Sequence, residues 1–189
     1  MLPPQRGCPA NAARCPLQSG CDLVHDRGLA AIAGLDDVAE PHVLQHAAHE
    51  AARIAAVIDQ HVEEAGFLAG LRDHAVRAPH YDLAHLLDLD NRIEAHLDAL
   101  QIGGLRSLDL VLKALDTNAE GEVFVAAILV FRGTNGTALA QLCEHLRRFP
   151  EGARFFAAAL GWLDWDQARP WVERLLASPE PLFRAIGLA

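Results

Sequence analysis

The chain has 189 residues, of which 51% are hydrophobic, and this is enough to bury a sizeable core in one domain or in two small ones. Its formal net charge of −9, from 25 acidic and 16 basic side chains, would repel a phosphate backbone and disfavours a nucleic-acid partner. The N-terminus lacks a secretion-signal pattern, and the longest strongly apolar run, residues 123–131, is too short to cross a bilayer, so we expect a cytoplasmic protein with no membrane partner.

Residues 1–40 are rich in Pro, Gly, Cys and Ala and keep neither a helical nor a strand period. This composition predicts a poorly ordered tail, and a translation start placed too far upstream would look the same. Aromatic side chains are few, with one Tyr, three Trp and seven Phe in the whole chain. A core built mainly of Leu, Ala, Val and Ile favours packed helices, and therefore an all-α fold.

The segment 41–103 is predicted to form an N-terminal helical region. Pro41 suits a first helical turn, and apolar residues then recur every three or four positions until Pro79, which disfavours helix in the residue before it. Asp82 is a suitable N-cap for a second helix over residues 83–100, and Gly103 with Gly104 should end that helix.

The segment 104–189 is predicted to hold shorter helices in antiparallel pairs. We expect a helix over 108–115 capped by Ser107, helices over 120–131, 137–148 and 150–163, one capped by Asp166 that ends at Ala177, and a last fragment from Pro179. Helices of this length with short connections stack into an α-solenoid of the HEAT type. Because the pattern stops without a polar capping repeat, we interpret this segment as the truncated front of a longer array.

Residues 123–131 are also compatible with a strand that enters a turn at Asn135 and Gly136. No alternating partner strand follows, because Leu139, Leu142 and Leu146 repeat with helical spacing. A buried helix is the preferred interpretation.

No nucleotide-binding loop or serine-hydrolase motif occurs, and no cofactor is expected. The three cysteines before residue 40 are spaced more widely than a zinc-binding pair. His42, His46 and His49 lie on the first predicted helix, where the first two could hold a metal ion from one face. Solvated histidines are the more common outcome, so a metal-dependent enzyme that uses this helix is kept as an alternative.

A charged face lies opposite the leucine stripe of the second predicted helix, and it consists of Asp88, Asp90, Arg92, Glu94, His96 and Asp98. Its simplest interpretation is solvation, and docking of a basic partner is the alternative. An aromatic cluster near the C-terminus joins Trp162, Trp165 and Trp171 to Phe155 and Phe156. A helical core is favoured over an exposed interface for this cluster.

Two motifs within residues 54–189 resemble an uncharacterised bacterial family. They are Arg72-x4-Arg77-Ala-Pro-His80 and Asp90-x-Arg92-x3-His96-Leu-Asp98. Members of this family look like longer proteins with HEAT-like repeats, often encoded near type VI secretion genes. The resemblance implies a non-enzymatic, protein-binding role, as an immunity protein or an adaptor for a secreted toxin. An acidic chain suits a basic toxin by charge complementarity.

The two motifs supply the predicted site: Arg72, Arg77, His80, Asp90, Arg92, His96 and Asp98. These residues are expected to form either a polar network between the first two helices or a surface for a partner. The network is favoured, because Arg–carboxylate pairs commonly hold helices together. A nonfunctional fragment of a longer repeat protein remains a third hypothesis.

Overall fold

The computed structural model describes residues 41–117, 120–133 and 135–189, and within these ranges the chain forms helices and no strand. The all-α prediction is therefore confirmed for the described part. The tail predicted for residues 1–40 lies outside the described residues. None of the described helices combines the length and the hydropathy needed to span a membrane.

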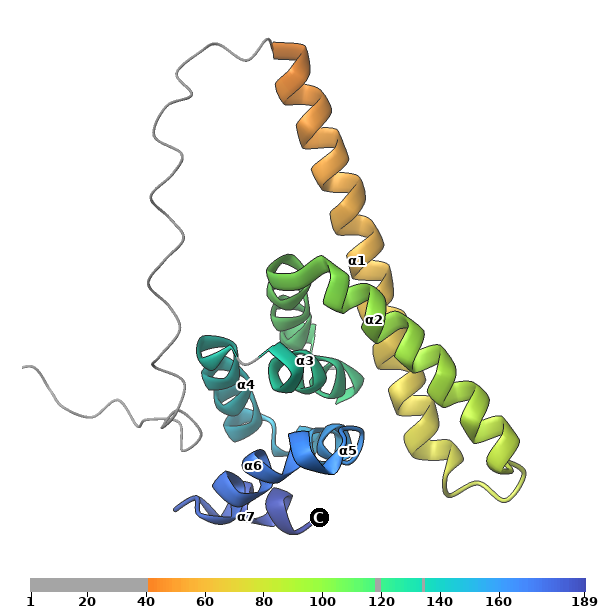
Figure 1. Ribbon diagram of the computed structural model, residues 1–189, viewed down its shortest axis with the longest axis vertical. Helices are drawn as coiled ribbons and strands as arrows, with labels where there is room; N and C mark the ends of the chain where they lie inside the picture. Colours follow the sequence, from red (N-terminus) through yellow and green to blue (C-terminus); the bar gives the residue numbers. More distant parts are fainter. Residues whose placement is uncertain (1–40, 118–119, 134) are drawn as a thin grey trace, which may run out of the picture.

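The first two helices, α1 (Pro41–Ala75) and α2 (Leu83–Ala114), form a long antiparallel hairpin (Figure 1). As predicted, Asp82 caps α2, and its side chain accepts a hydrogen bond from the backbone N–H of His85 at 2.9 Å. The second half of α1 packs against α2 and α3, whereas its first half projects beyond the other helices.

The end predicted for α2 at Gly103 and Gly104 is only partly right. Gly104 adopts a left-handed φ of 56°, which glycine tolerates, and there the helix axis bends. Helix resumes immediately beyond the bend and continues to Ala114. Ser107 is consequently a fully buried residue inside the helix, and its predicted role as an N-cap is wrong.

The central helix of the fold is α3 (Glu120–Gly133), which follows a short 3-10 turn at Leu115–Thr117. Residues 123–131 are all buried, because α1, α2, α4 and α5 pack around them. This confirms the buried helix and excludes the strand interpretation. The crossing with α1 is very close, since a Cβ atom at Gly121 would lie 2.1 Å from the carbonyl oxygen of Gly66.

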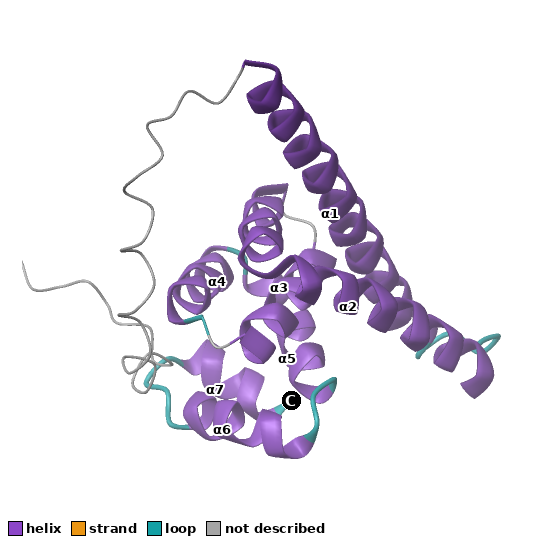
Figure 2. Ribbon diagram, turned by 45° about the horizontal axis from the view of Figure 1, so that its top comes forward, coloured by secondary structure: helices purple, strands orange, loops and turns teal. Residues whose placement is uncertain are grey.

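Four further helices complete the described part (Figure 2): α4 (Gly136–Arg148), α5 (Ala153–Gly161), α6 (Trp165–Leu176) and α7 (Pro181–Leu188). Their starts differ slightly from the sequence prediction. Asn135 caps α4, accepting from the N–H of Ala138 at 3.0 Å, and a 3-10 turn at Pro150–Gly152 precedes α5. Asp164, two residues before Asp166, occupies the N-cap position of α6.

The tryptophans divide between core and surface. Trp171 is buried against Phe131, their ring centroids 5.1 Å apart, as the core interpretation predicted. Trp165 is 64% exposed, which contradicts that interpretation at this position. Trp162 is half-buried, and its ring meets Phe124 edge-on with centroids 5.3 Å apart.

Candidate functional site

The two helices of the hairpin are joined by a double hydrogen bond between Arg72 of α1 and Asp90 of α2. The Arg72 Nε atom donates to Oδ1 of Asp90, and Nη2 donates to Oδ2 at 3.2 Å. Both side chains are about two-thirds buried, with 34% and 31% of their surface exposed. The planar guanidinium fork matches the carboxylate, so the pair fixes the relative position of the two helices.

The same arginine reaches the region after α5. Its Cζ atom lies 5.1 Å from the ring centroid of Trp162, in cation–π contact. The indole Nε1 of Trp162 in turn donates to Oε2 of Glu94 at 2.7 Å. The other oxygen of Glu94 accepts from Nη2 of Arg132, on α3, at 2.8 Å.

These contacts form one chain of five side chains, which we call the Arg72 network: Arg72, Asp90, Glu94, Arg132 and Trp162. It joins α1, α2 and α3 to the residue that follows α5. Two arginines face two carboxylates, and each carboxylate has an arginine donor. Such a balanced, hydrogen-bonded set stabilises helix packing and leaves no carboxylate free to act as an acid or base.

A second polar cluster lies farther along the hairpin and consists of His61, Glu64 and His96. The Nδ1 atoms of the two histidines are 2.9 Å apart, and Nε2 of His96 lies 3.2 Å from Oε2 of Glu64. At that separation one Nδ1 must donate and the other accept, so the pair holds only one proton between these two atoms. Burial lowers the pKa of His96, and the nearby Glu64 carboxylate opposes this effect.

The predicted site residues do not gather in one place. Arg72 and Asp90 form the pair described above, whereas His96 belongs to the separate histidine cluster. Arg77 bonds to Asp73 within the α1 region. His80 lies in the exposed turn between the helices, its ring 4.8 Å from that of Tyr81.

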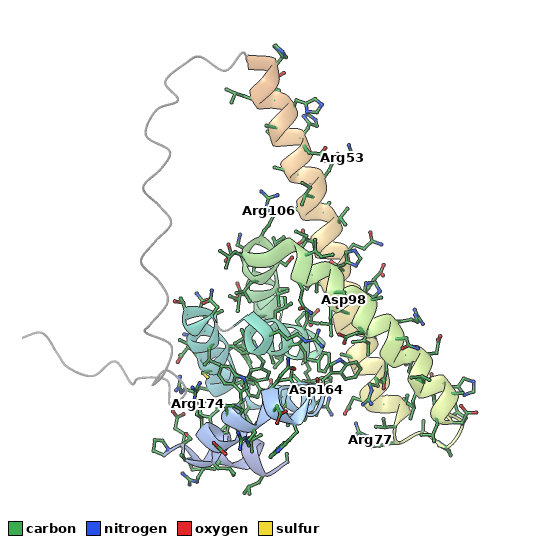
Figure 3. The ribbon with its side chains drawn as sticks, viewed as in Figure 1. Arg53, Arg77, Asp98, Arg106, Asp164 and Arg174 are labelled. Atoms are coloured by element: carbon green, nitrogen blue, oxygen red, sulfur yellow. The ribbon has the colours of Figure 1, made fainter. Side chains whose placement is uncertain are left out.

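The charged face predicted on α2 is divided by the fold. Asp90 and Glu94 turn toward arginines, so the solvation interpretation is wrong for these two residues. Arg92, Asp88 and Asp98 are exposed, and none of them bonds to an oppositely charged side chain of the described ranges. Figure 3 marks Asp98 on the hairpin.

Two members of the Arg72 network, Arg132 and Trp162, were not predicted to contact the hairpin. Arg132 is 38 residues from Glu94 in sequence and Trp162 is 68 residues away, so no local pattern connects them. Glu94 offered a signal, because it lies one helical turn after Asp90 and therefore on the same face.

One half-buried carboxylate has no arginine partner in the described ranges. Glu122, at the crossing of α3 with α1, has an Oε2 atom that makes no hydrogen bond in the described structure. Burial raises the pKa of Glu122, and the nearby Glu63 carboxylate adds to the effect.

No three His, Cys, Asp or Glu side chains in the described ranges lie close enough to hold a metal ion. The weak candidates His42, His46 and His49 are all exposed on the projecting half of α1. The structure therefore adds nothing in favour of a metal-dependent enzyme.

An open groove of about 660 Å³ separates the last turns of α2 from α4. Acidic and basic side chains mix along it, among them Asp109, Lys113, Glu144 and Arg148. Burial also lowers the pKa of His145 in this groove. Charges of both signs leave the groove without a clear preference for an anionic or a cationic ligand.

Comparison of the chain with protein-family models, with curated protein sequences and with solved structures finds no significant match. Function is therefore inferred from the residues and their geometry.

Proposed function

We propose that this protein is a non-enzymatic protein-binding module of a type VI secretion locus, and that its partner is a basic secreted toxin. The role is that of an immunity protein or of an effector adaptor. One observation carries the proposal: the outward carboxylates of the α1–α2 hairpin are exposed and have no cationic partner in the described ranges. They are Asp59, Glu63, Asp88 and Asp98.

The division of charges on α2 supports a binding surface rather than simple solubility. Asp90 and Glu94 already stabilise the helix packing through Arg72 and Arg132. Asp88 and Asp98 bond to no such arginine, and their negative potential extends into solvent. Exposed charges of one sign steer an oppositely charged protein toward the surface and orient it there.

The stacking of the helices supports an α-solenoid of the HEAT-like type as the scaffold. The odd-numbered helices pack in sequence order, α1 on α3, α3 on α5 and α5 on α7, and α2 meets α4 in a second row. Repeat arrays show this neighbour-to-neighbour packing, and they present extended surfaces to their partners.

Co-purification with the toxin encoded beside this gene tests the proposal. We expect a complex at low salt that weakens as the salt concentration rises, because the contact depends on exposed charges. Neutralising the surface with Asp88→Asn and Asp98→Asn together should weaken binding about tenfold, whereas Glu173→Gln, an exposed change on α6, should leave it unchanged. Failure to form a complex at low salt would contradict the proposal. Binding of the toxin by the neutralised variant with the affinity of the unmodified protein would contradict it too.

A further inference from the structure

Two histidine rings meet between α1 and α2, one from each helix. Nδ1 of His61 lies 2.9 Å from Nδ1 of His96, and the ring centroids are 5.1 Å apart. The side chain of His96 is 18% exposed and His61 is half-buried, so the pair is partly accessible to solvent. Histidine is the commonest metal ligand in proteins, and two of its nitrogens at this distance are a candidate site for a metal ion.

The spacing of the two nitrogens agrees with that of two ligands of one ion. Nitrogens about 2.0–2.1 Å from an ion and at a right angle to each other lie about 2.9 Å apart, whereas tetrahedral ligands lie about 3.3 Å apart. Right angles are the geometry of tetragonal ions, among them Cu²⁺ and Ni²⁺. In the hydrogen-bonded pair the two nitrogens face each other, so each ring must turn about its soft χ2 torsion to aim at a shared ion.

A carboxylate holds the other nitrogen of His96. Nε2 of His96 lies 3.2 Å from Oε2 of Glu64, and Oε1 of Glu64 accepts from Nε2 of Gln60 at 2.8 Å. Because Glu64 receives the Nε2 proton of His96, Nδ1 of that ring keeps its lone pair. A metal-binding histidine commonly donates its second N–H to a carboxylate in this way, and the carboxylate fixes the ring and raises its basicity.

Both histidines stand on firmly packed helices. Val62 and Leu97, which follow His61 and His96 in the sequence, are buried, so each histidine lies at the edge of the core. Ligands on packed helices are held more precisely than ligands on loops. The positive charge of Arg92, one turn before His96, also reaches that ring, but Arg92 is exposed and solvent screens it.

We propose that His61 and His96 bind one divalent transition-metal ion, Cu²⁺ or Ni²⁺, through their Nδ1 atoms, and that this ion links α1 to α2. The proton shared by the two Nδ1 atoms moves to Nε2 of His61, so both imidazoles stay neutral and each keeps one N–H. The described ranges hold no group of three His, Cys, Asp or Glu side chains able to bind one ion, so water molecules complete the coordination.

Thermal unfolding of the full chain, treated with EDTA and then measured with and without Ni²⁺, tests the site. Ni²⁺ is the probe because, unlike Cu²⁺, it does not oxidise cysteine thiols. At about ten times its dissociation constant, Ni²⁺ should raise the Tm by roughly 3–6 °C, because it binds the folded chain. Zn²⁺ at the same concentration should raise the Tm less, because its tetrahedral geometry does not suit the 2.9 Å spacing.

Variants assign the shift in Tm to this pair of histidines. His61→Gln and His96→Gln should each abolish the shift that Ni²⁺ causes. Glu64→Gln should increase the Ni²⁺ concentration needed for a half-maximal shift at least tenfold. The matched control combines His42→Gln with His46→Gln, two exposed changes on α1, and should keep the full shift. Each variant is compared with itself with and without the ion, so changes in its basal stability cancel.

The proposal is wrong if Ni²⁺ leaves the Tm of the unmodified protein unchanged. It is also wrong if His61→Gln and His96→Gln keep the shift, or if the control variant loses it, which would assign the ion to the exposed histidines. A larger shift with Zn²⁺ than with Ni²⁺ would contradict the right-angle geometry. Circular dichroism shows whether each variant folds, and where one histidine variant does not, the other and Glu64→Gln decide the test. The pair includes none of the outward carboxylates, so metal binding and toxin binding are tested independently.

Discussion

Arg72 shows how much one side chain contributes to this fold. Its guanidinium holds Asp90 through two hydrogen bonds and lies over the ring of Trp162 in cation–π contact, so it connects α1 to α2 and to the segment after α5. A lysine has the same charge but lacks the planar fork that bonds both oxygens of Asp90. The role of Arg72 therefore depends on shape as well as charge.

We accordingly expect Arg72→Lys to lower the free energy of unfolding by about 1 kcal/mol, a modest value because the pair is partly exposed. Arg77→Lys is the matched control, since Arg77 is exposed and bonds to Asp73 only four residues before it in the chain, and it should change stability by less than about 0.5 kcal/mol. Urea unfolding followed by circular dichroism measures both. Equal effects would mean that the Arg72 network does not hold the helices together.

At the scale of the elements, the crossing of α1 and α3 depends on two glycines. Gly121 and Gly66 bring the two helix backbones together at this point, with no room for a side chain between them. Gly70, one turn farther along α1, has open space at its Cβ position. A methyl group should therefore be tolerated at Gly70 and not at Gly121.

Gly121→Ala should lower the free energy of unfolding by about 2 kcal/mol, because its Cβ atom would force α3 away from the Gly66 carbonyl. Gly70→Ala should instead raise it by roughly 0.5–1 kcal/mol, since alanine is the better helix former and meets no neighbour. Thermal unfolding of the two variants distinguishes the expected loss of stability in Gly121→Ala from the expected gain in Gly70→Ala. A neutral Gly121→Ala would show that the helices cross at a greater distance.

For the whole molecule, burial of two histidines links stability to pH. The pKa of His96 and that of His145 are both lowered, chiefly by loss of solvation. Near and below the ordinary histidine pKa of 6.5, these two histidines bind protons more readily in the unfolded chain than in the folded protein. Acidification through this range therefore favours unfolding, and stability is recovered as the pH rises above it.

We expect the free energy of unfolding to fall between pH 7.5 and 6.0, and His96→Gln should reduce that fall. His49→Gln, an exposed change on α1, should leave the pH dependence as it is in the unmodified protein. Urea titrations at the two pH values provide the comparison. A stability that rises on acidification would contradict the assigned direction.

The sequence predicted local features well, because the interactions behind them act within one helical turn. The Asp82 cap, the helix over residues 123–131 and the end of the first helix before Pro79 all follow from neighbouring residues. The predicted site was less complete. Arg72 and Asp90 were both named in advance, but the contact of Arg72 with Trp162 depends on how α5 is placed. The bonds from Trp162 and Arg132 to Glu94 likewise depend on the placement of α5 and α3.

By itself, then, the sequence determined that the chain is acidic, that its part after residue 40 favours helices and that α1 is amphipathic, since composition and spacing are properties of the residues alone. Only the tertiary structure decided which carboxylates are paired and which remain exposed, and where the apolar face of α1 loses its cover. A single backbone turn at Gly104 changes the direction of α2. Contacts between distant residues follow from such turns, and no local pattern contains them.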